Sequence, residues 1–308
     1  MITLETANNA LKAVYLGIIG HNFDYTLDPL LAKIRYTTKG IYGNQIVKRV
    51  TIDGEDLVFK EDLESIFATV DISDKAIRCS QNSAGAFVDL LNSEIESMIK
   101  LSSHKLVSAF YTEDVKPNYL PKEMVYVPLK INGLKKLFDT ESDTLYGLNR
   151  KEVKELNPVI ETIDKFDPMK IQEIIDNYND EVDVIVCSSK IKREYMEYLS
   201  NHRQNIEILE LQGGFKCVKF NNILTMIQAK IPDNEIYLLN TKDFNFHQLC
   251  DWQWLENSQG EILQQLNGYP LYRATLVKYG NYICDQPNKQ IKVIVKNEPI
   301  TDKDTETT

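Results

Sequence analysis

Cys187 is the side chain whose type and position best suit covalent chemistry. It ends the apolar run VDVIVC, and a helical pattern follows it. Enzymes with alternating strands and helices often place a nucleophile at that point, and His202 or His247 could then act as its base. A free cysteine also packs like a small hydrophobic residue, so a buried core position is the interpretation we favour.

The remaining histidines and cysteines lack the spacing of a metal site. His247 and Cys250 form an HxxC pair that could supply half of a zinc site, but no second pair accompanies it. The other histidines stand far apart, at His21, His104 and His202. The five cysteines include no CxxC pair and are odd in number, which argues against a zinc ribbon or a disulfide scaffold and favours a reducing cytoplasm.

Motifs that bind phosphates or cleave esters and peptides are absent from the sequence. It contains no GxxxxGK followed by Ser or Thr, no GxGxxG, no HExxH and no GxSxG. We therefore expect no catalytic residue, no cofactor, no metal ligand and no enzymatic activity.

The charge pattern argues against a protein that grips nucleic acid. The 308 residues include 45 acidic and 35 basic ones, a net charge of −10, whereas phosphate binding calls for a basic face. Lys190, Lys192 and Arg193 form a small basic cluster, but Glu194 and Glu197 dilute it. That mixture favours a solvated helix face.

The aromatic pair in DWQWL is a candidate for an interface. If this segment is a strand, we expect Trp252 and Trp254 to point to opposite faces, one in the core and the other anchoring a partner. Core positions for both are the alternative. Lys135 and Lys136 are interpreted as surface residues.

The length indicates about two domains of ordinary globular composition, with 43% apolar and 26% charged residues. The densest apolar stretch near the start, residues 13–19, is far shorter than the ~20 residues that span a bilayer. Glu5 and Lys12 are out of place in a signal peptide. We therefore expect no membrane anchor.

Residues 35–81 have strand-like pieces, QIVKRVTI and IFATVDI, but no helix of useful length. Asp53-Gly54 is a turn dipeptide, so a long hairpin is the simplest prediction. So little core-forming sequence over such a length is unusual inside a compact domain. We therefore expect an arm that reaches outward and lacks a resting place on its own subunit.

Residues 83–112 predict one long amphipathic helix of about 28 residues, or ~40 Å. Ser83 can cap its start, and no proline follows until Pro117. The predicted buried face consists of Phe87, Leu91, Ile95, Met98, Ser102, Leu106 and Phe110. A helix of this length would run along a whole domain.

Residues 129–239 read as an α/β unit with a mixed sheet covered by helices. Asp167-Pro168 begins a helix, a buried strand VDVIVCSS follows, and Ser189 caps the next helix. The first helix should bury Ile171, Ile174, Ile175 and Tyr178. The further strands are ILEL, KCVKF and IYLLN, with a turn at Gly213-Gly214.

After residue 240, YRATLVKYGNYIC and KQIKVIVK alternate with period two, which predicts an antiparallel sheet packed against the long helix. The second domain is then discontinuous in sequence. The final residues, 297–308, have almost no apolar content and should form a mobile tail.

This order of elements resembles the major capsid proteins of tailed bacteriophages, which have the Hong Kong 97-type fold. The similar blocks run over nearly the whole chain: NALKAVYLGIIGHNF, DPLLAKI, SAGAFVDLLNSEI, DTLYGLNR, VDVIVCSSKIKREYMEYL, LELQGGFKCVKFNN, IYLLNTKDF and LCDWQWL. No block is diagnostic by itself, so the resemblance lies in their order.

The resemblance implies an α+β fold with an N-terminal arm, an extended E-loop hairpin, and a spine helix on an antiparallel P-domain sheet. It also implies an inserted α/β A domain. The implied division is 1–34 for the arm, 35–81 for the E-loop, 82–128 and 240–296 for the P domain, 129–239 for the A domain, and 297–308 for the tail.

The resemblance also implies a structural protein of the virion, assembled in the host cytoplasm as hexamers and pentamers around double-stranded DNA. Expected partners are further copies of the chain, a portal and decoration proteins. Because Met1 lies almost directly at the arm, we expect a separate scaffolding protein or none. Lys48 and Lys60 lie where some relatives form a crosslink, but we expect no crosslink here.

Three alternatives stay open. An encapsulin-like compartment shares the fold and packages enzymes, a cysteine-dependent enzyme would use Cys187, and a soluble binding module would be a small monomer.

Overall fold

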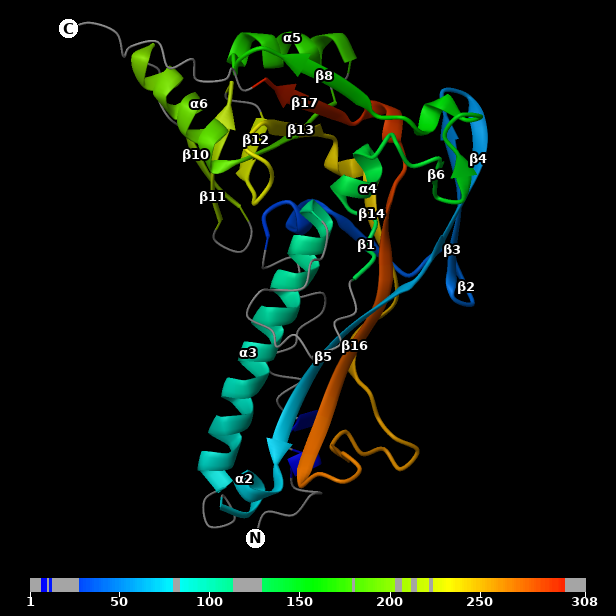
Figure 1. The fold of residues 1–308 in the computed structure, drawn as a ribbon, viewed down its shortest axis with the longest axis vertical. Helices are drawn as coiled ribbons and strands as arrows, with labels where there is room; N and C mark the ends of the chain where they lie inside the picture. Colours follow the sequence, from blue (N-terminus) through cyan, green and yellow to red (C-terminus); the bar gives the residue numbers. More distant parts are fainter. Residues whose placement is uncertain are drawn as a thin grey trace, which may run out of the picture. The chain divides into compact units, whose positions relative to one another are not determined.

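The structure is a computed structural model that describes residues 7–9, 11–12, 28–79, 84–112, 129–178, 181–202, 207–211, 215–221 and 224–296 (Figure 1). The chain forms two compact units. Unit 1 contains Met1–Lys136, Tyr146–Leu148 and Phe244–Ile283. Unit 2 contains Leu137–Leu145, Asn149–Asp243 and Cys284–Thr308. Ser83, Gly213 and Gly214, used in the sequence analysis, lie outside the described residues.

The main sheet of unit 1 is built around one long strand. Its strands are β1 (Arg35–Thr37), β5 (Glu64–Ser73), β14 (Phe244–Trp254), β15 (Gln264–Gln265) and β16 (Leu271–Cys284). β16 pairs antiparallel with β5 and with β15. β14 lies between β16 and β1, and β1 runs parallel to β14.

A separate three-stranded sheet contains the predicted hairpin, which is confirmed. It consists of β2 (Ile41–Tyr42), β3 (Gln45–Ile52) and β4 (Glu55–Asp62). The turn residues Asp53 and Gly54 have φ of 49° and 90°. Two successive positive φ angles are typical of the type I′ turn, whose twist matches that of paired strands.

The expectation that all of residues 35–81 lacks a place on its own chain is wrong. β5 pairs over its full length with β16, from Ser73 opposite Leu271 to Glu64 opposite Gly280. Part of the hairpin is also covered, because the buried Phe59 ring lies 4.9 Å from the Tyr146 ring. The partner of β5 lies about two hundred residues further along the chain, which local sequence patterns do not show.

The long helix is confirmed as α3 (Ala84–Tyr111), 28 residues that run alongside β5 and β16 (Figure 1). Of its predicted face, Phe87 falls among the side chains that are not described. The other six are buried: Leu91, Ile95, Met98, Ser102, Leu106 and Phe110. The Phe110 ring lies 4.7 Å from the Tyr282 ring, so the helix packs against the sheet as expected.

Unit 2 holds a seven-stranded mixed sheet in the order β10-β11-β12-β9-β13-β17-β8. Parallel pairs join β9 to β12 and β17 to β8, whereas β10-β11, β11-β12, β9-β13 and β13-β17 are antiparallel pairs. The strands are β8 (Val159–Ile163), β9 (Val184–Cys187), β10 (Ile208–Leu211), β11 (Phe215–Phe220), β12 (Leu224–Gln228), β13 (Glu235–Leu239) and β17 (Ile291–Val295). The predicted mixed sheet is confirmed, although β8 and β12 were not predicted.

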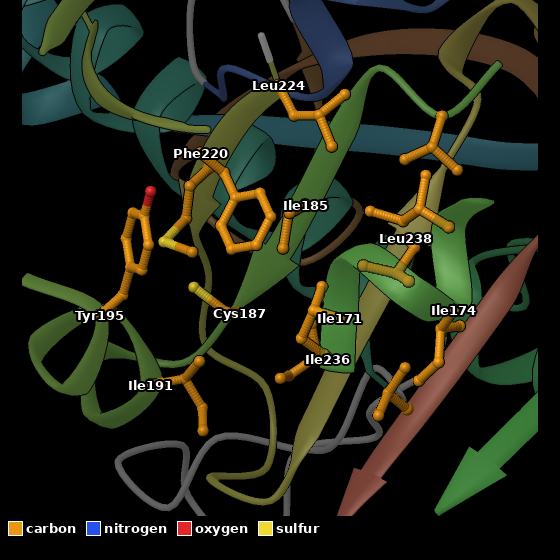
Figure 2. Packing of buried hydrophobic residues seen from close by; sticks show 14 of the residues in the cluster. Ile171, Ile174, Ile185, Cys187, Ile191, Tyr195, Phe220, Leu224, Ile236 and Leu238 are labelled. Carbon is orange, nitrogen blue, oxygen red and sulfur yellow. The ribbon is translucent and has the colours of Figure 1, made fainter. Parts of the chain in front are cut away.

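Two helices cover the core of this sheet, α5 (Pro168–Tyr178) and α6 (Ser189–Asn201) (Figure 2). The three isoleucines predicted for the buried face of α5 are buried, but Tyr178 is 51% exposed because it ends the helix. Ser188, not Ser189, caps α6, since the Ser188 hydroxyl accepts a hydrogen bond from the Ile191 amide.

The segment KQIKVIVK does not belong to the sheet of β16, contrary to the prediction. It forms β17, which lies between β13 and β8 in unit 2. Its alternating pattern specifies a strand with one buried face but does not specify the neighbours that cover it.

The remaining elements are short: η2 (Leu31–Lys33), α2 (Asp74–Cys79), α4 (Leu134–Phe138), β6 (Thr144–Leu145), β7 (Leu148–Asn149), η4 (Lys154–Leu156), η5 (Thr241–Asp243) and η6 (Pro287–Lys289). Among the helices of the described residues, none combines the length and the apolar character that crossing a bilayer requires.

Candidate functional site

Cys187 lies in the core of unit 2, which is the interpretation that the sequence favours. It is completely buried at the end of β9, and Figure 2 shows it among Ile191, Tyr195 and Phe220. Burial raises the pKa of the thiol to about 12, although the nearby Lys192 lowers it. A thiol with that pKa holds almost no thiolate at neutral pH, and the thiolate is the nucleophile.

The two histidines considered as its base are engaged elsewhere. His202 ends α6, and its Nδ1 lies 2.8 Å from the Tyr198 carbonyl oxygen. His247 lies in β14 of unit 1, with Nδ1 2.8 Å from the Lys39 carbonyl oxygen. Each ring therefore uses its Nδ1 in a contact with a backbone carbonyl oxygen of its own unit.

His247 and Cys250 do not converge on a metal. They are three residues apart on β14, so they project to opposite faces of the strand, His247 buried and Cys250 half-buried. Across the described part of the chain, no three His, Cys, Asp or Glu side chains gather in a way that could hold a metal ion.

The basic residues that the sequence analysis singled out lie on helix surfaces or form an ion pair. Lys190, Lys192 and Arg193 lie on α6, partly or fully exposed. Lys136, predicted as plain surface, instead forms an ion pair with Glu61 of β4, with Nζ 3.0 Å from Oε1. This pair ties the end of β4, at the base of the hairpin, to α4.

Trp252 and Trp254 are both buried, with 1% and 9% of their surface exposed. The expectation that they point to opposite faces is wrong, because strand side chains alternate with a period of two, so residues two apart share a face. The alternative, core positions for both, is confirmed.

Sequence reasoning missed a buried cation beside these residues. The Lys278 side chain is completely buried, and its Nζ lies 3.2 Å from the Asp251 carboxylate. Aromatic rings surround the ammonium group at 4.9, 5.2 and 5.9 Å, those of Tyr36, Phe246 and Trp252. The only sequence signal is that Lys278 has the inward parity of β16, between the buried Leu276 and Gly280.

Asn281 joins three segments of unit 1 at the base of the hairpin. Its Oδ1 accepts hydrogen bonds from the Asn132 and Tyr282 amides, and its Nδ2 donates one to the Asp62 carbonyl oxygen. This buried amide therefore fixes where the hairpin leaves the main sheet.

Large apolar side chains remain exposed on both units. On unit 1 they include Tyr42 and Val58 of the hairpin sheet and Phe67 of β5, exposed by 70%, 38% and 50%. On unit 2 they include Met169 and Ile208. Contiguous exposed apolar patches mark protein–protein contacts, whereas single exposed apolar side chains are common on any protein surface.

Solved structures show what this arrangement is similar to. The capsid asymmetric unit of cyanophage A-1(L) matches with a TM-score of 0.60 at 12% identity, over 88% of this chain and 93% of that chain. The holo-SrpI encapsulin complex from Synechococcus elongatus matches with a TM-score of 0.56 at 10% identity, over 89% and 92%. The chain has the Hong Kong 97-type capsid fold.

Identities near 10% accompany coverage of about nine tenths of each chain, so the similarity to these structures lies in the fold rather than in aligned identical residues. No protein-family model matches the sequence, and no curated protein matches it. The sequence-based resemblance to this fold is confirmed.

Lys48 and Lys60, considered for a crosslink, lie on β3 and β4 of this capsid fold. Lys48 is half-buried and Lys60 is exposed. The expectation that neither forms a crosslink stays a prediction.

Proposed function

We propose that the chain is the major capsid protein of a tailed bacteriophage. Copies assemble into hexamers and pentamers that close into an icosahedral shell around double-stranded DNA. The observation that carries the proposal is the match to the cyanophage A-1(L) capsid over nearly the full length of both chains. A match that includes the extended elements bears on assembly more directly than one limited to a globular unit.

The exposed hairpin surface supports a role in assembly. Shell contacts are heterologous, so each copy must present two different complementary surfaces. Tyr42 and Val58 are apolar and exposed on the isolated chain, and they gain burial when a neighbouring copy covers them. Each contact can be modest, since every copy makes many.

The proposed division of the chain follows from this role. The E-loop consists of β2, β3 and β4. It contains fewer residues than the expected range 35–81, because β5 pairs with β16 in the main sheet. α3 and the sheet of β16 form the P domain, and the seven-stranded sheet forms the A domain. The role needs no catalytic site, and its partners are other copies, a portal and decoration proteins.

The net charge of −10 suits a container for DNA. A strongly basic inner wall would bind the duplex through its phosphates and hinder its packaging and release. We infer a neutral to acidic inner face.

Negative-stain electron microscopy of the purified full chain tests the proposal. Closed shells, tubes or hexameric rings are expected, together with early elution from a size-exclusion column. A chain that stays monomeric at all concentrations, with or without co-expressed phage structural proteins, contradicts it.

An encapsulin-like compartment is the second candidate, favoured by the match to the encapsulin complex with a TM-score of 0.56. The two candidates differ in their contents. Shells from the native source that hold nuclease-protected DNA support the capsid, whereas shells that hold a co-purifying enzyme support the compartment. The neighbouring genes separate them too: portal and terminase genes accompany a capsid, and a cargo enzyme gene accompanies a compartment.

A further inference from the structure

The sequence contains two Asn-Gly pairs, Asn132-Gly133 and Asn267-Gly268, and both belong to unit 1. An asparagine before a glycine can react within the chain, because the glycine nitrogen can reach the carbonyl carbon of the asparagine side chain. Glycine favours this approach, since it has no Cβ atom and its backbone is the least restricted. Whether such a pair reacts in a folded protein depends on its surroundings, and these differ between the two pairs.

The pair Asn132-Gly133 is buried and fixed in place. Asn132 is 4% exposed, and its backbone amide donates a hydrogen bond of 2.8 Å to Asn281 Oδ1. The Gly133 amide, whose nitrogen would have to react, donates one of 2.9 Å to the Ile131 carbonyl oxygen. Gly133 also lies so close to Phe110 that a Cβ atom would be 2.0 Å from its carbonyl oxygen. The backbone of this pair therefore cannot rotate without local unfolding.

The pair Asn267-Gly268 is exposed in the turn that joins β15 to β16. The Tyr269 amide donates a hydrogen bond of 3.1 Å to the Leu266 carbonyl oxygen, and Gly268 has a φ of 84°, as in a type II turn. Within the described part of the chain, neither the Asn267 carboxamide nor the Gly268 amide has a hydrogen-bond partner. A Cβ atom at Gly268 would meet nothing within 4 Å. Both reacting groups are therefore open to water and to each other.

We propose that Asn267 is a site of spontaneous deamidation, which converts its side-chain amide into a carboxylate. The Gly268 nitrogen attacks the Asn267 Cγ atom, and the new N–C bond closes a succinimide ring. The bond from Cγ to the side-chain nitrogen breaks, and this nitrogen leaves as ammonia with the proton of the Gly268 amide. Water then adds to either ring carbonyl and returns a proton to the Gly268 nitrogen, which gives aspartate or isoaspartate.

The two products act differently on the turn. Aspartate adds a negative charge and leaves the backbone path unchanged, whereas isoaspartate also places the Cβ carbon in the main chain. The turn is held by a hydrogen bond of 2.9 Å from the Leu266 amide to the Leu271 carbonyl oxygen. The Pro270 carbonyl oxygen accepts another of 2.9 Å from the Asp74 amide, at the start of α2. Isoaspartate lengthens the turn and therefore loosens both contacts.

Peptide mapping by mass spectrometry tests the proposal on unassembled full-length chains kept in warm, mildly alkaline buffer. The proteolytic peptide that contains Asn267 should gain about 1 Da, because OH replaces NH2, and should separate into two isomers. Asn132 is the control within the same sample and should convert at least about tenfold more slowly, since its pair must first open. The synthetic peptides QLNGYP and INGLKK give the rate of each pair without the fold.

Asn267→Gln is the matched variant and should keep a constant mass, because its longer side chain would have to close a larger ring. Asn267→Asp adds the charge alone, so hydrogen exchange at the Leu266 amide should be slower in this variant than in isoaspartate-containing chains.

Conversion at Asn267 that is no faster than at Asn132 overturns the proposal, as does conversion more than about tenfold slower than in QLNGYP. Equal exchange in the isoaspartate and aspartate forms overturns the effect on the turn. The comparison of the two asparagines needs no variant. Since the chemistry is measured on unassembled chains, its failure leaves the proposed shell function untouched.

Discussion

Lys278 is a buried residue whose importance for stability is not apparent from the sequence. Removing an ammonium group from water is expensive, and its contacts repay the cost only if the geometry is good. Here a carboxylate oxygen at 3.2 Å and three aromatic faces within 6 Å surround it. The pair is therefore sensitive to the loss of either partner.

Lys278→Ala should lower the free energy of unfolding by about 3 kcal/mol, because it leaves a cavity and removes the ammonium group that pairs with the Asp251 carboxylate. Chemical denaturation of the unassembled chain measures the loss. The double variant Lys278→Met with Asp251→Asn should recover much of it, since neither charge remains. Lys296→Ala, which breaks the exposed pair with Asp164, is the control and should cause no measurable change. An unaltered denaturation midpoint for Lys278→Ala would contradict this account.

Gly133 is required by a close approach of two backbones. A Cβ atom at this position would lie 2.0 Å from the Phe110 carbonyl oxygen near the end of α3. Gly133→Ala should therefore cost about 2 kcal/mol or more, because backbone must move to admit it. Thermal denaturation checks the prediction. Gly43→Ala tests backbone strain alone, since that site has open space but a φ of +64°.

At the scale of elements, local chemistry explains the features that the sequence predicted well. The turn at Asp53-Gly54, the face of α3 and the start of α5 each depend on residues within one or two turns of each other. At Asp167, the carboxylate accepts a hydrogen bond from the Met169 amide, which is the expected start of a helix. Signals of this kind depend on residues close in sequence, so they specify the same local structure whatever the rest of the fold is.

The N-cap of α6 can be assigned by mutation, because either of two adjacent serines could fill this position. Ser188 accepts the hydrogen bond from the Ile191 amide, whereas Ser189 is the exposed first residue of the helix. Ser188→Ala should destabilise unit 2 by about 1 kcal/mol. Ser189→Ala should change the stability by less than about 0.5 kcal/mol. If the two variants exchange these effects in urea denaturation, the cap is one residue later than the structure has it.

At the scale of the whole molecule, the proposed shell places the exposed hairpin residues against other copies. Tyr42→Asp combined with Val58→Asp should leave the thermal denaturation of the unassembled chain nearly unchanged, because both side chains are exposed there. Shell yield should fall roughly tenfold or more, since each shell repeats the lost apolar contact many times. Met169→Asp, at an exposed apolar residue of α5, is the control for added charge. Normal shell yield from the hairpin variant would exclude this surface as a contact.

The sequence alone determined the long helix, the hairpin turn, the mixed α/β unit and the burial of Cys187, and the order of the elements was enough to indicate the capsid fold. Three features became apparent only from the folded chain: β5 pairs with β16, β17 belongs to the seven-stranded sheet, and aromatic rings surround Lys278. The first group depends on neighbours along the chain, whose spacing can be read directly. The second depends on partners far apart in sequence, such as Asp71 and Arg273 at a separation of 202 residues, and period-two alternation is the same whichever strand lies alongside.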